Sequence, residues 1–247
     1  MKIGLRICVN SLQGALQGVP SLLRLLDEYK IRASFFFAVG PDRSGRFLRR
    51  NPLQPWQSQL SLASRLYGTL LLPPDLSQRA SDSMRAVEAA GHEVGLLACD
   101  RYAWVTKAAF ADEVWTEREV TRGIEGFAKV FGKPPKAFAA AAWQVNPHLF
   151  KLEQELGFQY ASDIRGKSMF LPVLREVESD CPQVPTTLPT LEDLLKKSVH
   201  SAAWPCLLAE RRDGRHGISA PDGEADCHVE RVWGRVDHSG RHLRQCG

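Results

Sequence analysis

A chain of 247 residues, with 44% hydrophobic and 24% charged residues and a net charge of +4, suits one α/β domain with a sizeable core. No stretch approaches the ~20 consecutive apolar residues of a membrane span. Met1-Lys2 leads straight into a predicted strand, so no signal peptide is expected. Six scattered cysteines without a CxxC pair favour a reducing compartment over a disulfide scaffold.

Strands and helices alternate along roughly the first 160 residues. Residues 3–9 and 31–39 read as strands, and the run of three phenylalanines in the second suits a strand that is buried on both faces. A helix opens between them at Gly18-Val-Pro. The alternation continues with predicted helices at 76–90, 107–131 and 147–156 and predicted strands at 92–98, 136–142 and 159–162. This order argues for a parallel α/β architecture, but periodicity alone does not distinguish a barrel from an open sheet.

The stretch 92–104, HEVGLLACDRYAW, changes character in its middle. Its first half is a short apolar run typical of a buried strand. Its second half brings Asp100, Arg101, Tyr102 and Trp104 together. The end of a buried strand is where α/β enzymes place their chemistry. The alternative is a plain strand end followed by a solvated loop.

Five blocks of the sequence, in this order, resemble the polysaccharide deacetylase superfamily. They are KIGLRICVN with the residues that follow it, HEVGLLACDRYAW, PKAFAAAAWQVN, YASDIRG and VPTTLPT. Within the superfamily they resemble the bacterial deformylases of undecaprenyl phosphate-linked 4-formamido-arabinose. The resemblance covers roughly residues 1–198, and it is strong over 4–42, 92–104 and 160–190. It implies a distorted (β/α) barrel that is incomplete at its C-terminal end.

The resemblance also implies a site whose reactive groups this chain has replaced. In the family an aspartate and two histidines hold a divalent metal such as Zn, Mn or Co, and a second aspartate is the general base. Here Cys8 stands at the base position, and Asn10, Leu97 and Arg101 stand at the ligand positions. Leucine cannot ligate a metal, and a permanently charged arginine repels one. We therefore expect no metal cofactor in this chain.

Other positions of the implied site are kept. Trp143, Asp163 and Arg165 match residues that position the reacting groups in the family. The family expects an arginine where Gln144 follows the tryptophan, and an acid is usual where Asn146 stands. The frame of an active site is predicted without its reactive groups.

The insertion at about 41–74 combines arginine with large apolar residues. Residues 39–66 contain five arginines and only one aspartate. Such a segment fits a membrane interface, or else an amphipathic helical hairpin packed on the barrel. The resemblance favours an anionic membrane surface at the cytoplasmic face of the bacterial inner membrane, bound peripherally, and otherwise a cytoplasmic location. The candidate membrane-binding residues are Arg46, Arg49, Arg50, Trp56, Leu60 and Tyr67.

The alternation fails after the predicted deacetylase-like domain at 1–204. The tail at 205–247 lacks the His-Ala-Glu block of the family. It reads either as a disordered, loop-like tail or as a segment translated out of frame. Its seven arginines are balanced by seven acids, which argues against nucleic acid as a partner. A zinc site is the less favoured interpretation of its Cys227, His228, His238, His242 and Cys246.

By resemblance, the α/β scaffold is that of a hydrolase that cleaves non-peptide C–N (amide) bonds. By resemblance, the ancestral reaction removes a formyl group from an amino-arabinose on undecaprenyl phosphate, a step of lipid A modification and resistance to cationic peptides such as polymyxin. The substitutions predict a catalytically impaired or inactive member, so enzymatic activity stays an open question. The alternative is a non-catalytic protein that binds the lipid phosphate or the sugar. The two differ in whether metal and turnover can be recovered.

Overall fold

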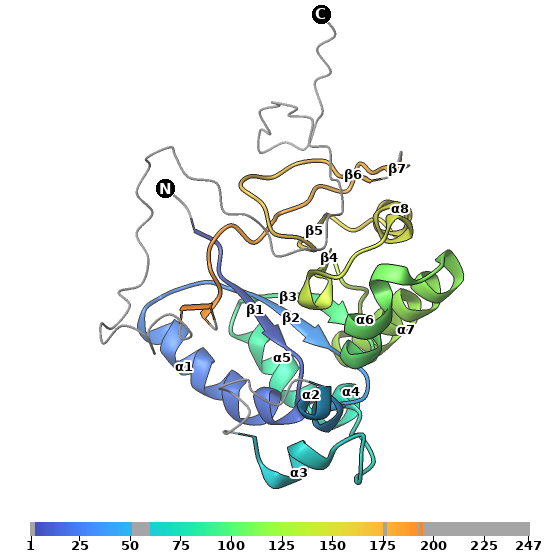
Figure 1. Cartoon of the computed structure of the whole chain (residues 1–247). Coiled ribbons are helices and arrows are strands. Elements are labelled where there is room, and N and C mark those ends of the chain that lie inside the picture. Colours follow the sequence, from blue (N-terminus) through green and yellow to red (C-terminus); the bar gives the residue numbers. More distant parts are fainter. Residues whose placement is uncertain (1–2, 51–59, 175–176, 192, 195–247) are drawn as a thin grey trace, which may run out of the picture.

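Five parallel strands form the sheet that organises the chain, in the order β1-β2-β3-β4-β5 (Figure 1). The computed structural model describes residues 3–50, 60–174, 177–191 and 193–194. The strands are β1 (Arg6–Val9), β2 (Ser34–Ala38), β3 (Glu93–Ala98), β4 (Ala137–Phe138) and β5 (Tyr160–Ala161). A separate antiparallel pair is made by β6 (Val173–Leu174) and β7 (Val177–Glu178).

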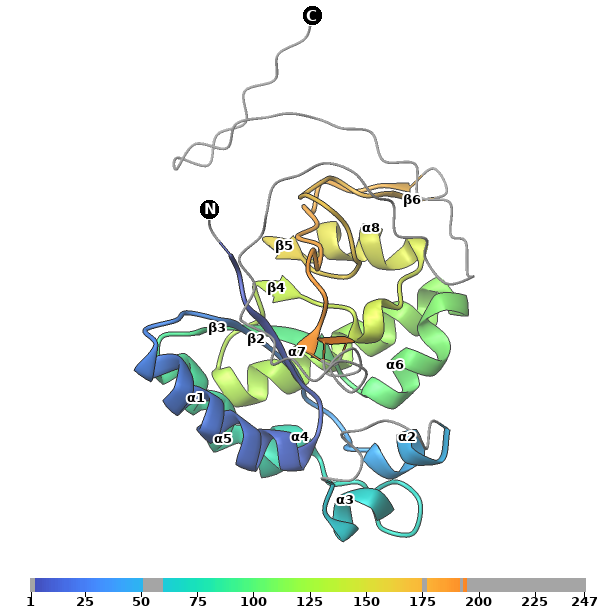
Figure 2. The ribbon, with the colours of Figure 1, turned by 60° about the vertical axis from the view of Figure 1, so that its left-hand side comes forward.

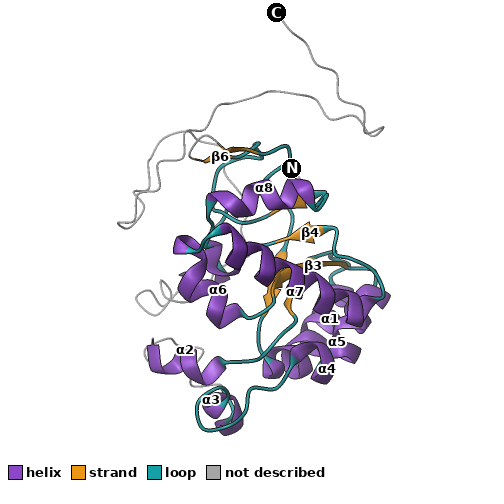
Figure 3. Cartoon of the chain, turned by 90° about the vertical axis from the view of Figure 1, so that its right-hand side faces the viewer, coloured by secondary structure: helices purple, strands orange, loops and turns teal. Residues whose placement is uncertain are grey.

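Helices connect the parallel strands, as a right-handed crossover requires. Figures 1 and 2 show α1, α5 and α7 along one side of the strands, and all views place α2 beside α3 at one end of the molecule (Figure 3). The helical segments are η1 (Gly14–Gly18), α1 (Val19–Glu28), α2 (Ser44–Arg50), α3 (Leu62–Leu66), α4 (Leu76–Arg79), α5 (Ser81–Ala89), α6 (Arg101–Lys107), η3 (Ala108–Phe110), α7 (Glu113–Phe131), η4 (Ala141–Trp143) and α8 (Pro147–Glu155).

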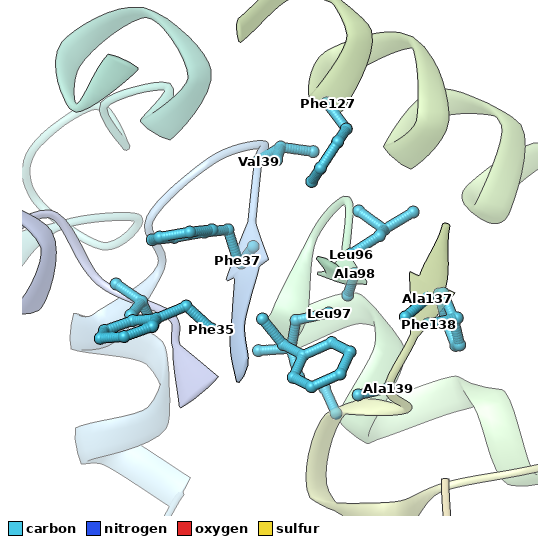
Figure 4. Packing of buried hydrophobic residues seen from close by; sticks show 14 of the residues in the cluster. Phe35, Phe37, Val39, Leu96, Leu97, Ala98, Phe127, Ala137, Phe138 and Ala139 are labelled. Carbon is cyan, nitrogen blue, oxygen red and sulfur yellow. The ribbon is translucent and has the colours of Figure 1, made fainter. Parts of the chain in front are cut away.

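Strand β2 is buried on both faces, as its three phenylalanines predict. All three side chains are at most 1% exposed. Figure 4 shows Phe37, Val39 and Leu96 on the side of Phe127 from α7, whereas Leu97 points to the other side, toward Ala139. Because side chains alternate along a strand, the sheet has an outer face against the helices and an inner face.

Two glycines let α7 approach the sheet closely. A Cβ on Gly123 would lie 3.0 Å from a Leu96 methyl, and one on Gly126 would lie 2.8 Å from a Val39 methyl. Glycine inside a helix costs about 1 kcal/mol relative to alanine. Here that cost is offset by packing the helix backbone directly on β2 and β3.

The predicted strands are confirmed but are shorter than predicted, and two predicted helices are each divided. The helix at 76–90 breaks at Ala80, whose φ and ψ of −122° and 10° are not helical. The helix at 107–131 breaks before Asp112, whose carboxylate accepts a hydrogen bond from the backbone N–H of Trp115 (2.8 Å) and begins α7. An N-cap aspartate favours a helix start over helix continuation.

The parallel sheet curves into an open arc, because Arg6 on β1 donates hydrogen bonds to Ser162 and Thr186, which follow β5 at the other end of the strand order. Beyond β5 it continues through parallel bridges from Ala161 to Gln183 and from Arg165 to Thr186. No helix within the described ranges is both long and apolar enough to cross a membrane. The tail at 205–247, with its proposed zinc ligands, lies outside the described residues.

Candidate functional site

The four substituted positions lie on neighbouring segments of the fold. Cys8 is on β1 and Leu97 is near the end of β3, and both strands pair in parallel with β2 between them. Asn10 directly follows β1, and Arg101 is the first residue of α6. The carboxyl ends of parallel strands share one edge of a sheet, so these positions belong to the same edge.

Cys8 stands beside a guanidinium group in the interior of the arc. Arg6 Nε donates to Cys8 Sγ at 3.3 Å. The Arg6 guanidinium carbon lies 5.7 Å from the ring centroid of Phe36 and 5.7 Å from that of Trp143. Cys8 is exposed, so its thiol is accessible at the position that the resemblance assigns to a carboxylate base.

Neither Leu97 nor Arg101 can act as a metal ligand. Leu97 is 1% exposed and is part of the hydrophobic core. The Arg101 guanidinium carbon lies 4.1 Å from the ring centroid of Phe47, a cation–π geometry that fixes its positive charge at the start of α6. The ring of Phe47 also meets Tyr102 edge-on, with 5.3 Å between centroids.

The carboxylates at this edge already serve the backbone. Asp42 is 1% exposed and accepts hydrogen bonds from the N–H groups of Leu12 (2.8 Å) and Ser44 (2.9 Å). Asp100 Oδ1 accepts from the N–H of Ala103 at the start of α6 (3.1 Å). Its Oδ2 lies 2.7 Å from Arg43 Nε, close enough for an ion pair but not aligned as a hydrogen bond.

The donor set therefore does not fit the divalent metal that the resemblance implies. An amide, a leucine and an arginine stand at the three ligand positions, and the nearby carboxylates are engaged. Over the described residues, no group of three or more His, Cys, Asp or Glu side chains is arranged to hold a metal ion. We derive no chemical step that runs through a metal in this chain.

Trp143 lies on a strained turn that other elements hold in place. Ala142 and Trp143 both adopt left-handed backbone angles, with φ of 54° and 55°. Such angles cost about 1–2 kcal/mol for each residue that has a side chain. The indole Nε1–H donates to Thr186 Oγ1 (3.1 Å), and the Arg165 guanidinium carbon lies 4.2 Å from the indole centroid. Strain of this kind is concentrated at binding sites.

Asp163 holds the backbone just before this turn in place. It is 0% exposed, and its Oδ1 accepts a hydrogen bond from the N–H of Ala140 (2.6 Å). Gln183 Nε2 donates to Asp163 Oδ2 (2.7 Å) and to Glu153 Oε2 (3.1 Å), so one amide joins two buried carboxyl groups. Asp163 thus acts on the shape of the turn rather than at the surface of the site.

We infer that the buried carboxyl groups of Glu153 and Asp163 hold one proton between them, because two like charges in contact are not both ionised when buried. Burial, and next the Asp163 charge, raise the pKa of Glu153 well above its usual range. Burial also raises the pKa of Asp163, against hydrogen bonds from Glu153, Gln183 and Ala140 that lower it. Glu153 Oε1 has no hydrogen-bond partner among the described residues. A proton on Glu153 lets it donate to Asp163 and removes this defect.

The predicted membrane-binding residues are divided between surface and core. Arg46, Arg49 and Arg50 are exposed on α2, Leu60 is half-buried, and Trp56 lies outside the described residues. Tyr67 instead packs against the core. The most exposed leucines of the insertion are ones the candidate set leaves out, namely Leu62 (75%), Leu70 (82%) and Leu72 (91%).

Sequence reasoning missed several residues of the site. Arg6 lies two residues before Cys8 and therefore on the same strand face, which is a signal that could have identified it. Glu153, Gln183 and Thr186 had no such signal, because their contacts come from segments far apart in the chain.

Comparison with known proteins yields one family. The profile described as polysaccharide deacetylase matches residues 13–161, more than half of the chain. A protein of Shewanella sediminis (strain HAW-EB3), named as the 4-deoxy-4-formamido-L-arabinose-phosphoundecaprenol deformylase ArnD, is 36% identical over 79% of this chain and 66% of its own length. A protein of that name from Wigglesworthia glossinidia brevipalpis is 28% identical over 74% of this chain and 67% of its own length. The chain thus spans about two thirds of these relatives.

Similarity of structure agrees with the sequence match. The crystal structure of a Mycobacterium smegmatis protein described as a polysaccharide deacetylase superposes with a TM-score of 0.50. The match covers 74% of this chain and 58% of that one at 21% identity, so it concerns the fold. The parallel sheet with its covering helices is the fold of that protein. On the profile match over more than half of its length, the chain belongs to the polysaccharide deacetylase family.

Proposed function

We propose that this chain is a degenerate deformylase that no longer carries out the metal-dependent hydrolysis of its relatives. The reaction it descends from is the hydrolytic removal of a formyl group from 4-formamido-arabinose on undecaprenyl phosphate, a step of lipid A modification and polymyxin resistance. One observation carries the proposal. At the two positions where the family has histidines, Leu97 is buried in the core and Arg101 is stacked on Phe47.

The second candidate is a non-catalytic protein that binds the lipid-linked sugar on the same scaffold. The turn at Trp143 favours it, because two left-handed residues are costly and are still held by Arg165 and Thr186. An indole face and a guanidinium are groups that stack on sugar rings and pair with phosphate. The Arg165 guanidinium also pairs with Asp193 at 3.0 Å, so a phosphate would share it with that carboxylate, and neither group depends on a metal.

The proposal includes peripheral attachment to an anionic membrane at the cytoplasmic face. Two features of the same insertion support this attachment. The arginines of α2 are exposed, and so are Leu62, Leu70 and Leu72, which are 75–91% exposed. The protein should sediment with phosphatidylglycerol vesicles and less at high salt, because surface charge is screened over ~10 Å at 0.1 M salt. Equal absence from anionic and neutral vesicles at low salt contradicts this attachment.

Restoring the family residues tests the degenerate-deformylase proposal. The four-fold variant carries Cys8→Asp, Asn10→Asp, Leu97→His and Arg101→His, which supplies three ligands and a base. Removing Arg101 is as important as adding histidine, since a unit charge about 4 Å from another is worth about 4 kcal/mol at an effective dielectric constant of ~20. Metal uptake, followed by Co²⁺ absorption and elemental analysis, is expected to return before formate release from a formamido-sugar phosphate does.

A matched control separates removal of charge from addition of ligands. The variant Arg101→Gln alone removes the positive charge without adding the histidine and aspartate ligands. This variant should bind no metal. A folded four-fold variant that takes up no more metal than this control means that the four positions do not converge, and the proposed site is then wrong. Binding of the formamido-sugar by the unmodified chain without formate release favours the second candidate.

A further inference from the structure

A cavity of about 560 Å³ lies beside α2 and is dominated by positive charge. Three of its six lining residues are arginines on one short helix. Arg49 and Arg50 follow Arg46 by three and four residues, so each of them is a neighbour of Arg46 on the helix surface. The lining residues are Arg46, Arg49, Arg50, Gly68, Thr69 and Tyr102.

The helix itself does not account for this cluster. Like charges three and four residues apart destabilise a helix. Arginines in the last turn suit the negative end of the helix dipole, but Arg46 is the third residue of α2, near the positive end. In the part of the chain that the structure describes, no carboxylate lies within 4.0 Å of any of the three guanidinium groups. An external anion would remove the repulsion.

Two contacts fix the position of the Arg46 side chain at the cavity. Its Nε–H donates to the carbonyl oxygen of Gly68 at 2.6 Å, and its guanidinium carbon lies 5.7 Å from the ring centroid of Tyr102. The remaining N–H donors of Arg46 have no partner among the described residues. Gly68 makes this contact in a left-handed conformation (φ 75°), where a Cβ would lie 3.2 Å from the Arg43 side chain. The cost of ordering the Arg46 side chain is therefore met before any ligand arrives.

The chemistry of the lining selects a phosphate group. Guanidinium groups bind phosphate oxygens through paired, charge-assisted hydrogen bonds. The Thr69 hydroxyl donates to the Leu66 carbonyl (2.8 Å), so it offers no donor to a ligand. The three guanidinium groups supply only donors, the Tyr102 hydroxyl can donate as well as accept, and none of the described lining residues is anionic.

The cavity adjoins the edge at which the substituted positions lie. Tyr102 lines the cavity and follows Arg101 in α6, and the ring of Phe47 packs against both side chains. From this arrangement we infer that the cavity binds the phosphate group of a phosphate ester whose other end lies at the carboxyl edge of the sheet. Only the position of that other end rests on the proposed function. The phosphate site itself does not.

The test compares a short isoprenyl phosphate, its alcohol and inorganic phosphate as ligands of the full-length protein. Farnesyl phosphate, below its micelle concentration, should bind at one site by calorimetry, and farnesol should not. The double variant Arg49→Gln/Arg50→Gln should weaken binding at least tenfold, whereas Arg49→Lys/Arg50→Lys should keep part of it. Arg24→Gln removes an exposed arginine of α1, outside the cavity, and should leave binding unchanged.

Each outcome decides the inference. Equal binding of farnesol, or equal affinity of the wild type and the double glutamine variant, overturns it. If inorganic phosphate binds as tightly as farnesyl phosphate and depends on the same arginines, the site stands with free phosphate as its source. If the double glutamine variant keeps farnesyl phosphate binding and loses only its association with phosphatidylglycerol vesicles, these arginines serve the membrane surface and the inference is overturned. Failure of the four-fold metal variant leaves all of these results intact.

Discussion

Replacing Glu153 by glutamine is expected to remove the contribution of this carboxyl group to the pH dependence of the free energy of unfolding. Glu153 is 0% exposed, and burial followed by the Asp163 charge raises its pKa well above the usual 4.5. The folded protein therefore binds this proton more tightly than the unfolded chain does. The stabilisation that this bound proton gives the folded protein is fully present below about pH 4.5 and is lost as pH rises through the folded-state pKa of Glu153. For one proton the slope is at most about 1.4 kcal/mol per pH unit.

Glutamine imitates the protonated state of Glu153. Its carbonyl oxygen can accept the hydrogen bond that Gln183 Nε2 now gives at 3.1 Å, and its amide N–H can donate to Asp163. The variant should match the wild type near pH 4.5 and exceed its free energy of unfolding at neutral pH. The difference should widen by up to about 1.4 kcal/mol for each pH unit until the folded-state pKa is passed.

The measurement is urea unfolding of both proteins at half-unit steps from pH 4.5 to 8. Glu155→Gln is the control, because it makes the same change on the same helix at a carboxylate that is 55% exposed and pairs with Lys151 at 3.6 Å. It should shift stability by no more than a surface ion pair does, about 0–1 kcal/mol, with no widening. Parallel curves for Glu153→Gln and the wild type refute the shared proton.

Two further predictions concern packing and thiol chemistry. Gly95→Ala should lower the free energy of unfolding by about 1–3 kcal/mol in urea titrations, because its Cβ would lie 2.6 Å from the Phe36 ring. In the native protein at pH 8, iodoacetamide should alkylate Cys8, which is exposed, before Cys99 and Cys181. Burial raises the pKa of Cys99 to about 11 and that of Cys181 to about 12, so about one Cys99 thiol in a thousand is a thiolate at pH 8.

The controls for these two predictions use the same chain. Gly18→Ala should be neutral or stabilising, since nothing lies within 4 Å of its added Cβ. A loss there equal to that at Gly95 contradicts the packing argument. Peptide mass spectrometry identifies each alkylated cysteine, and native labelling of Cys181 at the rate of Cys8 contradicts the burial argument. In urea all these thiols should react alike.

The strands and the helices between them were predictable from sequence because apolar runs bounded by turn residues mark each element. The ends of the strands were not predictable, because apolar composition continues past the point where the backbone turns. The strand predicted at 136–142 ends at Phe138, since Ala140 donates to Asp163 and Ala142 turns left-handed. An alanine run carries no local signal for this change. The contact that decides it comes from an aspartate 23 residues away.

Only some residues of the candidate site were named from the sequence, and none of their contacts were. Resemblance identified Trp143, Asp163 and Arg165, but nothing local indicates that Trp143 is held by Thr186. The arginines of α2 likewise stood out by composition, whereas the cavity beside them needs Tyr102 from another helix. Periodicity reports one element at a time, and sites of this kind form where several elements meet.

Arg6 places a constraint on the synthesis of the protein. Its guanidinium donates to the carbonyl and hydroxyl oxygens of Ser162 and to the hydroxyl of Thr186, partners 156 and 180 residues later in the chain. At about 5–20 residues per second a ribosome needs roughly 9–36 s to add those 180 residues. During that interval β1, β2 and β3 can pair while this cation lacks its partners on the inner face. A nascent chain that is halted before Thr186 should therefore hold β1 more loosely than the finished protein does, and a chaperone has its longest access to that strand.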